Sequence, residues 1–140
     1  EVLRRFDSQD VVIKAAAVAD YRPATFHEQK MKKKEGPMTL ELVRTRDILA
    51  ALGQAKKEQF LVGFAAETED VERHALEKLE KKNLDLIVAN NVVTPGAGFD
   101  VDTNAVTMYN RAGMYRSLPV MSKREVANRL LDAIKELRHG

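Results

Sequence analysis

The chain of 140 residues lacks cysteine, and this absence excludes disulfide bonds, thiolate metal sites and a cysteine nucleophile. It also lacks any apolar run near the ~20 residues that a membrane-spanning helix requires. The chain also has no large excess of one sign of charge, because 23 basic residues nearly balance 21 acidic residues and leave a net charge of +2. We therefore expect a cytoplasmic location, no membrane partner and no globally basic surface for nucleic acid.

The glycine patterns of nucleotide-binding loops are also missing. Neither G-x-G-x-x-G nor G-x-x-x-x-G-K-[ST] occurs in the sequence. A nucleotide could still bind, but lysines or another segment would have to hold its phosphates. An NAD(P)-binding oxidoreductase of similar topology is one alternative, and such an enzyme would be expected to carry a Tyr-x-x-x-Lys pair. The residues four positions after the three tyrosines are Thr25, Gly113 and Pro119, which argues against that alternative.

Positive charge is concentrated in one place, the stretch "EQKMKKKEGP", which contains Lys30, Lys32, Lys33 and Lys34. Such a run on a loop is usually solvated, and a non-catalytic nucleotide- or nucleic-acid-binding module is a second alternative. The run has no aromatic side chain to stack on bases, so we predict no nucleic-acid partner. It starts ten residues after Asp20, close enough in the chain to act as a lid over an anion.

The hydrophobic pattern indicates the fold. Three nearly continuous apolar runs span residues 10–20, 59–68 and 84–91, as expected for strands covered on both faces of a parallel sheet. Helical patterns lie between and after them. Residues 38–45 alternate like a half-exposed strand, and residues 104–120 have the pattern of an antiparallel hairpin. The sequence therefore predicts an α/β, three-layer Rossmann-like fold with a mainly parallel sheet plus antiparallel strand additions.

The last helix carries its own start signal. Ser122 is the predicted N-cap, and Glu125 stands three residues later, which is the spacing of a capping box. An apolar stripe follows along one face of this helix, formed by Val126, Leu130, Ala133, Ile134 and Leu137. We expect this stripe to pack against the sheet.

Polar residues stand where the three apolar runs end. These residues are Asp20, Glu67, Thr68, Asn90 and Asn91. In parallel α/β sheets, ligands bind in the crevice beyond the carboxyl ends of the strands, so this cluster is a candidate site. The alternative, that the strands simply end in polar loops, stays open at this point.

Four further residues have both a structural and a functional interpretation. Lys78 and Lys82 fall at the edge of the buried stripe of the predicted helix, where their stems could cover apolar surface or their ammonium groups could meet an anion. Phe64 could belong to the core or stack on a base. Asp47 begins a helix, where a carboxylate favours the dipole and can cap the backbone.

Taken together, several segments resemble a known family. "AAAVADYRP", then "KMKK", "GFAAET" and "KKNLDLIVANN" occur in the order and spacing of phosphopantothenoylcysteine synthetase, over essentially all 140 residues. This synthetase is one activity of the bacterial bifunctional coenzyme A biosynthesis protein. The resemblance implies a dimeric ligase that uses CTP and magnesium to activate 4'-phosphopantothenate as an acyl cytidylate. The amine of cysteine then displaces CMP.

The resemblance also implies a set of nucleotide-binding residues: Ala15, Ala16, Asp20, Lys30, Asp47, Ile48, Leu49, Phe64, Lys78 and Lys82. Ala15 and Ala16 would offer backbone beside the acyl cytidylate, and Asp20 would lie against the nucleotide. Lys30 would be the catalytic residue, as the first lysine of a flap that closes over the site. The segment 47–49 would recognise the cytosine end. The sequence identifies no magnesium ligands.

The chain departs from the family in two places. Arg46 stands where the family usually has a proline before the base-recognition aspartate, and the glycine-rich N-terminal segment that holds phosphopantothenate is missing. We therefore expect residues 1–140 to form one domain, a fragment of the synthetase domain, and to form the amide poorly without that segment. FMN would belong only to a separate decarboxylase domain outside these residues.

Overall fold

The computed structural model describes residues 1–32, 35–67, 69–91 and 101–139. Its elements are α1 (Val2–Phe6), β1 (Val11–Lys14), β2 (Tyr21–Pro23), β3 (Leu42–Arg44), α2 (Ile48–Ala55), β4 (Phe60–Glu67), α3 (Val71–Lys81), β5 (Leu86–Asn91), β6 (Thr103–Asn110), β7 (Gly113–Ser122) and α4 (Lys123–His139). They form two compact units: a larger one of Glu1–Ala15 and Ile48–Gly140, and a smaller one of Ala16–Asp47. The expectation that residues 1–140 act as one domain, a fragment of a synthetase domain, stays a prediction.

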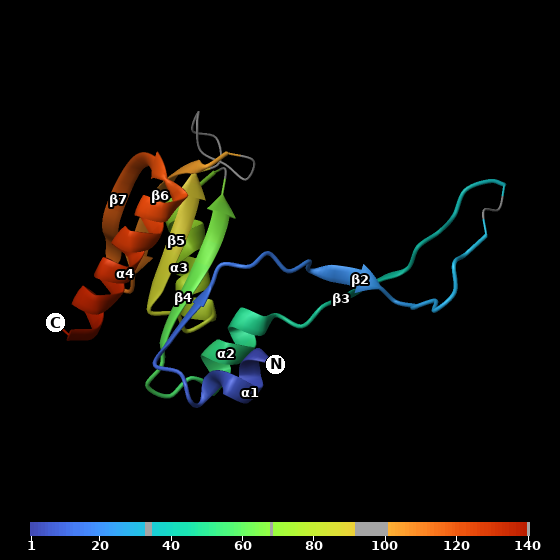
Figure 1. Cartoon of the computed structure of the whole chain (residues 1–140), viewed down its shortest axis with the longest axis horizontal. Helices are drawn as coiled ribbons and strands as arrows, with labels where there is room; N and C mark the ends of the chain where they lie inside the picture. Colours follow the sequence, from blue (N-terminus) through green and yellow to red (C-terminus); the bar gives the residue numbers. More distant parts are fainter. Residues whose placement is uncertain (33–34, 68, 92–100, 140) are drawn as a thin grey trace. The chain divides into compact units, whose positions relative to one another are not determined.

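A five-stranded sheet in the order β1-β4-β5-β6-β7 forms the centre of the larger unit (Figure 1). β1, β4 and β5 run parallel, whereas β6 and β7 are added antiparallel to them. β4 and β5 are nearly continuous apolar runs because both of their faces are covered, whereas β1 stands at the edge of the sheet and its Ile13 is exposed. The predicted fold class, parallel strands with antiparallel additions, is confirmed.

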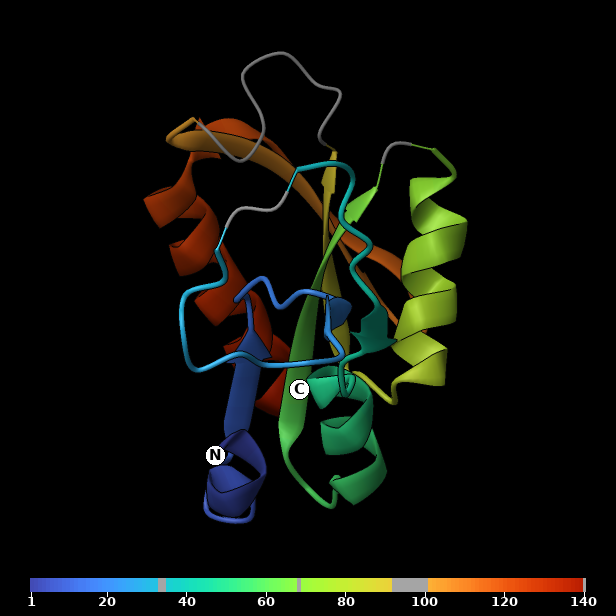
Figure 2. The same ribbon diagram turned by 90° about the vertical axis from the view of Figure 1, so that its right-hand side faces the viewer.

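Helices cover both faces of this sheet, with α3 and α4 on opposite sides (Figure 2). On one face, α1, α2 and α3 pack through residues such as Phe6, Leu52 and Leu79 onto the sheet. On the other face, Leu130 and Ile134 of α4 pack on a second apolar cluster. The sheet therefore lies between two separate cores, which gives the three layers that the sequence predicts.

Local signals in the sequence explain how β6, β7 and α4 follow one another. The hairpin between β6 and β7 turns at Asn110, whose side-chain Oδ1 accepts a hydrogen bond from Ala112 N at 2.9 Å. Gly113 has a φ of +115°, a conformation that favours glycine. Ser122 and Glu125 form the expected capping box, with Glu125 N donating to Ser122 Oγ at 3.2 Å and Ser122 N to Glu125 Oε2 at 3.1 Å.

The smaller unit contains a two-stranded antiparallel ladder in which Tyr21 pairs with Arg44 and Pro23 with Leu42. The Thr45 hydroxyl donates a hydrogen bond to Ala19 O at 2.5 Å, next to the Tyr21–Arg44 pair at one end of the ladder. The guanidinium of Arg44 lies 5.8 Å from the centre of the Tyr21 ring, a cation–π distance. The described residues of this unit are therefore held by backbone pairing and a few polar contacts rather than by a buried core.

Two of the strands are shorter in the structure than the sequence pattern predicts. The strand predicted at 10–20 ends at Lys14, and only Leu42–Arg44 of the strand predicted at 38–45 is extended and paired. The segment after Lys14 is rich in alanine, which has low strand propensity. The second strand is limited by the three residues of its partner, β2. Among the described residues, no helix has the length and apolar character needed to cross a membrane.

Candidate functional site

The carboxyl ends of β4 and β5 place an aromatic ring and an amide on one face of the sheet. Phe64 pairs with Val88 in parallel register, and Asn90 lies one step further along the same face, opposite Ala66. Phe64 is half-buried and packs against the core beneath α4. Asn90 Oδ1 is buried and, within the part of the chain that the structure describes, has no hydrogen-bond partner. A buried amide oxygen without a partner is costly, so it can accept a donor from a ligand at this edge.

Asn90 is a candidate site residue that is missing from the nucleotide-binding set implied by the family resemblance. The sequence signal was its position at the end of an apolar run, where it was one of several polar residues. The structure adds that its oxygen is shielded from water and unsatisfied. Thr68 lies outside the described residues.

Ile48 and Leu49 form the start of α2. Leu49 is only 6% exposed and belongs to the core between α2, α3 and the sheet. Ile48 is half-buried against the same core. The side chain of Leu49 is therefore committed to packing, and a ligand could meet this residue only through its backbone. Asp47 immediately precedes the helix and is exposed.

Two of the predicted cations, Lys78 and Lys82, lie at the C-terminal end of α3. Lys78 is in the last turn and Lys82 is the C-cap, and both are half-buried. The half-burial agrees with their expected position at the edge of the apolar stripe. Positive charge at a helix C-terminus is favoured by the helix dipole. This placement therefore suits a structural role as well as a role toward an anion.

Asp20 does not stand at a strand end, which corrects the sequence analysis. β1 ends at Lys14, and the alanine-rich chain continues without a strand partner before Asp20. The backbone of Asp20 instead begins the β2–β3 ladder, because its carbonyl accepts a hydrogen bond from Thr45 N at 2.8 Å. Its side chain is exposed. Glu67 and Asn91 do end neighbouring strands and pair with each other.

The predicted residues are divided between the two units. Ala15, Ile48, Leu49, Phe64, Lys78 and Lys82 belong to the larger unit, whereas Ala16, Asp20, Lys30 and Asp47 belong to the smaller one. Lys30 is exposed, and Lys33 and Lys34 lie outside the described residues. The assembly of both sets into one site stays a prediction.

Magnesium has no cage of protein ligands in the described ranges, because no three His, Asp or Glu side chains there group closely enough to hold an ion. Nucleotide enzymes commonly bind Mg²⁺ through substrate phosphates and only one or two carboxylates. The residues present therefore do not define a magnesium site, and we assign no ligands to the ion.

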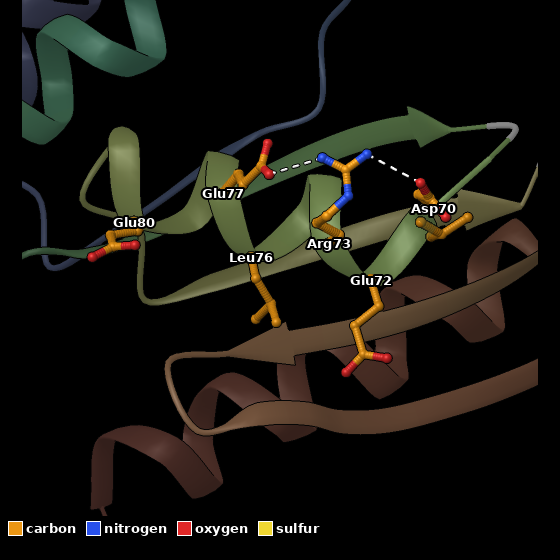
Figure 3. Close-up of a pocket in the computed structure, with 7 residues that line it drawn as sticks. Asp70, Glu72, Arg73, Leu76, Glu77 and Glu80 are labelled. Atoms are coloured by element: carbon orange, nitrogen blue, oxygen red, sulfur yellow. Dashed lines mark hydrogen bonds and ion pairs between the residues drawn. The ribbon is translucent and has the colours of Figure 1, made fainter.

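A pocket of about 600 Å³ on the outer side of α3 contains none of the predicted residues (Figure 3). Arg73 in this pocket binds Asp70 and Glu77, each at 3.0 Å, while Glu72 and Glu80 add further negative charge. Its hydrogen bonds to Asp70 and Glu77 raise the pKa of the Arg73 guanidinium. A phosphate group would meet more carboxylates than cations here, so this pocket does not suit a nucleotide.

Comparison with known proteins identifies the family. Residues 1–137 match the family described as DNA/pantothenate metabolism flavoprotein, C-terminal domain, so the chain belongs to that family. The coenzyme A biosynthesis bifunctional protein CoaBC of Bacillus subtilis (strain 168) is 57% identical over 136 residues, which cover 97% of this chain and 34% of that protein. The protein of the same name from Vibrio vulnificus (strain YJ016) is 45% identical over 139 residues, with the same shares covered.

A solved structure supports the same assignment. The crystal structure of the C-terminal domain of coenzyme A biosynthesis bifunctional protein CoaBC superimposes with a TM-score of 0.76 and 43% identity, covering 97% of this chain and 58% of that one. The chain thus spans about a third of the length of the curated relatives it matches. The family that the sequence motifs indicated is confirmed.

Proposed function

We propose that this chain belongs to a CTP-dependent ligase that joins 4'-phosphopantothenate to cysteine in coenzyme A biosynthesis. The observation that carries the proposal is the match of 97% of the chain, at 57% identity, to a coenzyme A biosynthesis protein. The aromatic ring of Phe64 and the unsatisfied Asn90 oxygen at one sheet edge support nucleotide binding there.

The reaction proceeds in two displacements. A carboxylate oxygen of 4'-phosphopantothenate attacks the α-phosphorus of CTP, pyrophosphate leaves, and an acyl cytidylate forms. The amine of cysteine then attacks the acyl carbon, CMP leaves, and the nitrogen loses a proton as the amide forms. Such a reaction needs positioning and charge neutralisation rather than a covalent protein nucleophile. The absence of cysteine from the chain is compatible with this chemistry.

The residues take complementary roles in this proposal. Phe64 stacks on the base, Asn90 accepts a hydrogen bond from the ligand, and the backbone of Ile48 and Leu49 borders the base. Lys30 neutralises the charge that develops on the phosphates. The other predicted residues, Ala15, Ala16, Asp20, Asp47, Lys78 and Lys82, complete the nucleotide site. Magnesium supplies charge neutralisation when it is bound with the triphosphate.

The assembly and location follow from the same proposal. We propose that the protein is a cytoplasmic homodimer whose partners are CTP, 4'-phosphopantothenate and cysteine, with FMN only in a separate decarboxylase domain. Nucleic acid is not a partner in this proposal, because the basic run itself contains no aromatic side chain to stack on bases.

Calorimetric titration tests the proposal directly. The full chain, in buffer with magnesium, should bind CTP more tightly than ATP or NAD. Equal affinity for the three, or no binding of CTP, would contradict the proposal. In a longer version that adds the family's N-terminal segment to this chain, pyrophosphate should be released from CTP only when 4'-phosphopantothenate is present. Release without the acid would show that CTP is hydrolysed and does not activate a carboxylate.

A further inference from the structure

Asn104, near the start of β6, has a buried amide oxygen without a hydrogen-bond partner among the described residues. Asn104 is 7% exposed, and its Oδ1 is shielded from water. A buried acceptor that lacks a donor costs its desolvation penalty, and most such groups in folded proteins are paired. Gln59 shows the ordinary arrangement, because it is also 7% exposed but its Oε1 accepts a hydrogen bond from Lys57 N at 2.8 Å. The Asn104 oxygen is therefore a candidate ligand contact.

Asn90 brings a second such oxygen to the same face of the sheet. Asn90 pairs with Val106 across β5 and β6, and Asn104 lies two residues from Val106 along β6. Asn104 and Val106 are both buried positions of an alternating strand, so they face the same side, toward α4. Diagonal neighbours of this kind lie about 7–8 Å apart, so one small group can contact both side chains. Within the described ranges, the two unpartnered oxygens thus form an acceptor pair at the edge where β5 ends.

The chemistry of this acceptor pair restricts the group that it can bind. Both atoms are carbonyl oxygens, which accept hydrogen bonds and cannot donate to a phosphate or a carboxylate. Both are also uncharged, whereas a buried cation requires an opposite charge beside it. The pair therefore suits a neutral group that carries two N–H or O–H donors close together.

We propose that Asn90 and Asn104 bind the amino group of the substrate cysteine. This inference rests on the proposed function and concerns its second displacement. The attacking amine must be uncharged, because an ammonium nitrogen has no lone pair. With its two N–H bonds directed at the two amide oxygens, the amine keeps its lone pair free for the acyl carbon. The lone pair forms the C–N bond as the acyl C–O bond breaks, CMP leaves with that electron pair, and the nitrogen releases a proton to water.

The position of the acceptor pair agrees with the order of groups in the acyl cytidylate. Phe64, which stacks on the base in the proposed function, is separated from Asn104 by four residue steps along the strands and two strands across. That separation is roughly 16 Å. It leaves room for the ribose and the phosphate between the base and the acyl carbon. An amine held by Asn104 and Asn90 would therefore lie at the acyl end of the intermediate.

The test compares Asn104→Leu with Gln59→Leu, which change two equally buried amides to the same apolar residue. Asn104→Leu removes an unpartnered oxygen, so the urea midpoint of the chain should stay the same or rise. Gln59→Leu should lower the midpoint, because Lys57 N loses its acceptor. Loss of stability in Asn104→Leu equal to that in Gln59→Leu would overturn the proposal, because it would show that the Asn104 amide serves the fold.

Steady-state kinetics of a version that carries the family's N-terminal segment measures the effect on the substrate. Asn104→Leu should raise the KM for cysteine about five- to hundredfold and change the Kd for CTP by less than about twofold. Gln59→Leu should keep the KM of the wild type. An unchanged KM for cysteine in Asn104→Leu would overturn the proposal, and so would a weakened Kd for CTP, which would assign the oxygen to the nucleotide.

A second measurement does not depend on turnover. The side-chain amide signals of Asn90 and Asn104 in the chain itself should shift in NMR spectra when L-cysteine is added at alkaline pH, where more of its amine is uncharged. The analogue 3-mercaptopropionate has the thiol and the carboxylate but no amine, and it should leave both signals unchanged. Equal shifts with the two compounds, or no shift with cysteine, would overturn the proposal. If the longer version releases no pyrophosphate from CTP, the proposed function fails, and this titration still decides whether the pair binds an amine.

Discussion

The Tyr115 hydroxyl donates a hydrogen bond to Glu136 Oε2 at 2.6 Å. This bond joins β7 to α4, although the two residues are 21 positions apart in the sequence. Arg116 binds the same oxygen at 2.8 Å. The hydrogen bond from Tyr115 lowers the pKa of the Glu136 carboxyl, and the same bond raises the pKa of the Tyr115 hydroxyl. This small surface cluster holds the second half of the hairpin against the last helix.

The Tyr115–Glu136 bond predicts a stability difference that depends on pH. Folding lowers the pKa of Glu136. Its contribution to the stability of the folded state is therefore present above the ordinary carboxyl pKa, and it is lost as pH falls through the lowered pKa of the folded state. Because the pKa of Tyr115 is raised, its contribution is present below the ordinary phenol pKa and is lost as pH rises through the raised value. Tyr115→Phe should therefore lower Tm slightly at neutral pH and less in acid or strong alkali.

Thermal unfolding followed by circular dichroism across pH 2 to 11 measures this difference. The control is Tyr115→Phe in a Glu136→Gln background, where the acid-side change in the difference should disappear because no carboxylate titrates. A Tm difference that stays constant from acid to neutral pH would contradict the prediction, because it would show that the contribution of Tyr115 does not depend on the ionised Glu136 carboxylate.

Gly53→Ala should destabilise the fold strongly. A Cβ at position 53 would stand 1.8 Å from the backbone oxygen of Lys82 and 2.8 Å from its carbonyl carbon, and backbone atoms cannot move aside like a side-chain tip. Overpacking of this kind costs about 1–3 kcal/mol or more. Urea unfolding measures the effect. Gln54→Ala, at an exposed position of the same helix, is the control and should change stability by within about 0.5 kcal/mol. Equal urea midpoints for Gly53→Ala and Gln54→Ala would contradict the close approach of Gly53 to the Lys82 backbone.

Phe64→Leu should weaken CTP binding more than it weakens folding. Leucine keeps an apolar side chain on the core beneath α4 but removes the ring that would stack on the base. Stacking on an aromatic is worth about 1–3 kcal/mol, so the Kd for CTP should rise about 5- to 150-fold. Calorimetric titration measures the Kd for CTP.

Phe60→Leu is the matched control, because Phe60 belongs to the same strand and the same core at the other end of β4. If both variants bind CTP like the wild type, Phe64 is a core residue only.

Lys30→Ala should reduce turnover without reducing stability. If Lys30 meets the reacting phosphates, its loss should lower kcat for amide formation about ten- to a thousandfold, by analogy with other lost charge-stabilising donors. Its side chain is exposed, so the unfolding midpoint should hardly change. Steady-state kinetics of a version that carries the family's N-terminal segment measures kcat. Lys57→Ala is the control, since Lys57 is an exposed lysine paired with Asp7 at 3.2 Å, outside the proposed site. Equal kcat for Lys30→Ala and the wild type would show that Lys30 has no role in turnover and that the lysine run is only a solvated loop.

The layers of the fold and several local features could be predicted from the order of the residues alone. The apolar runs predicted β4 and β5, the Ser122–Glu125 spacing predicted the start of α4, and the turn near Asn110 predicted the hairpin. These features follow from short-range rules, because strand burial, capping and turns depend on residues close in the chain. The motif set also indicated the family correctly.

How far the strands extend, and which side chains are available to a ligand, became clear from the three-dimensional structure. Asp20 could not be separated from a strand end by pattern, because β1 stops where its pairing with β4 stops, at Lys14 opposite Gly63. The side chain of Leu49 proved to be core, and the Asn90 oxygen proved to be buried without a partner among the described residues. Burial and pairing depend on contacts between residues distant in sequence, and a linear pattern specifies which faces are apolar but not which atoms meet there.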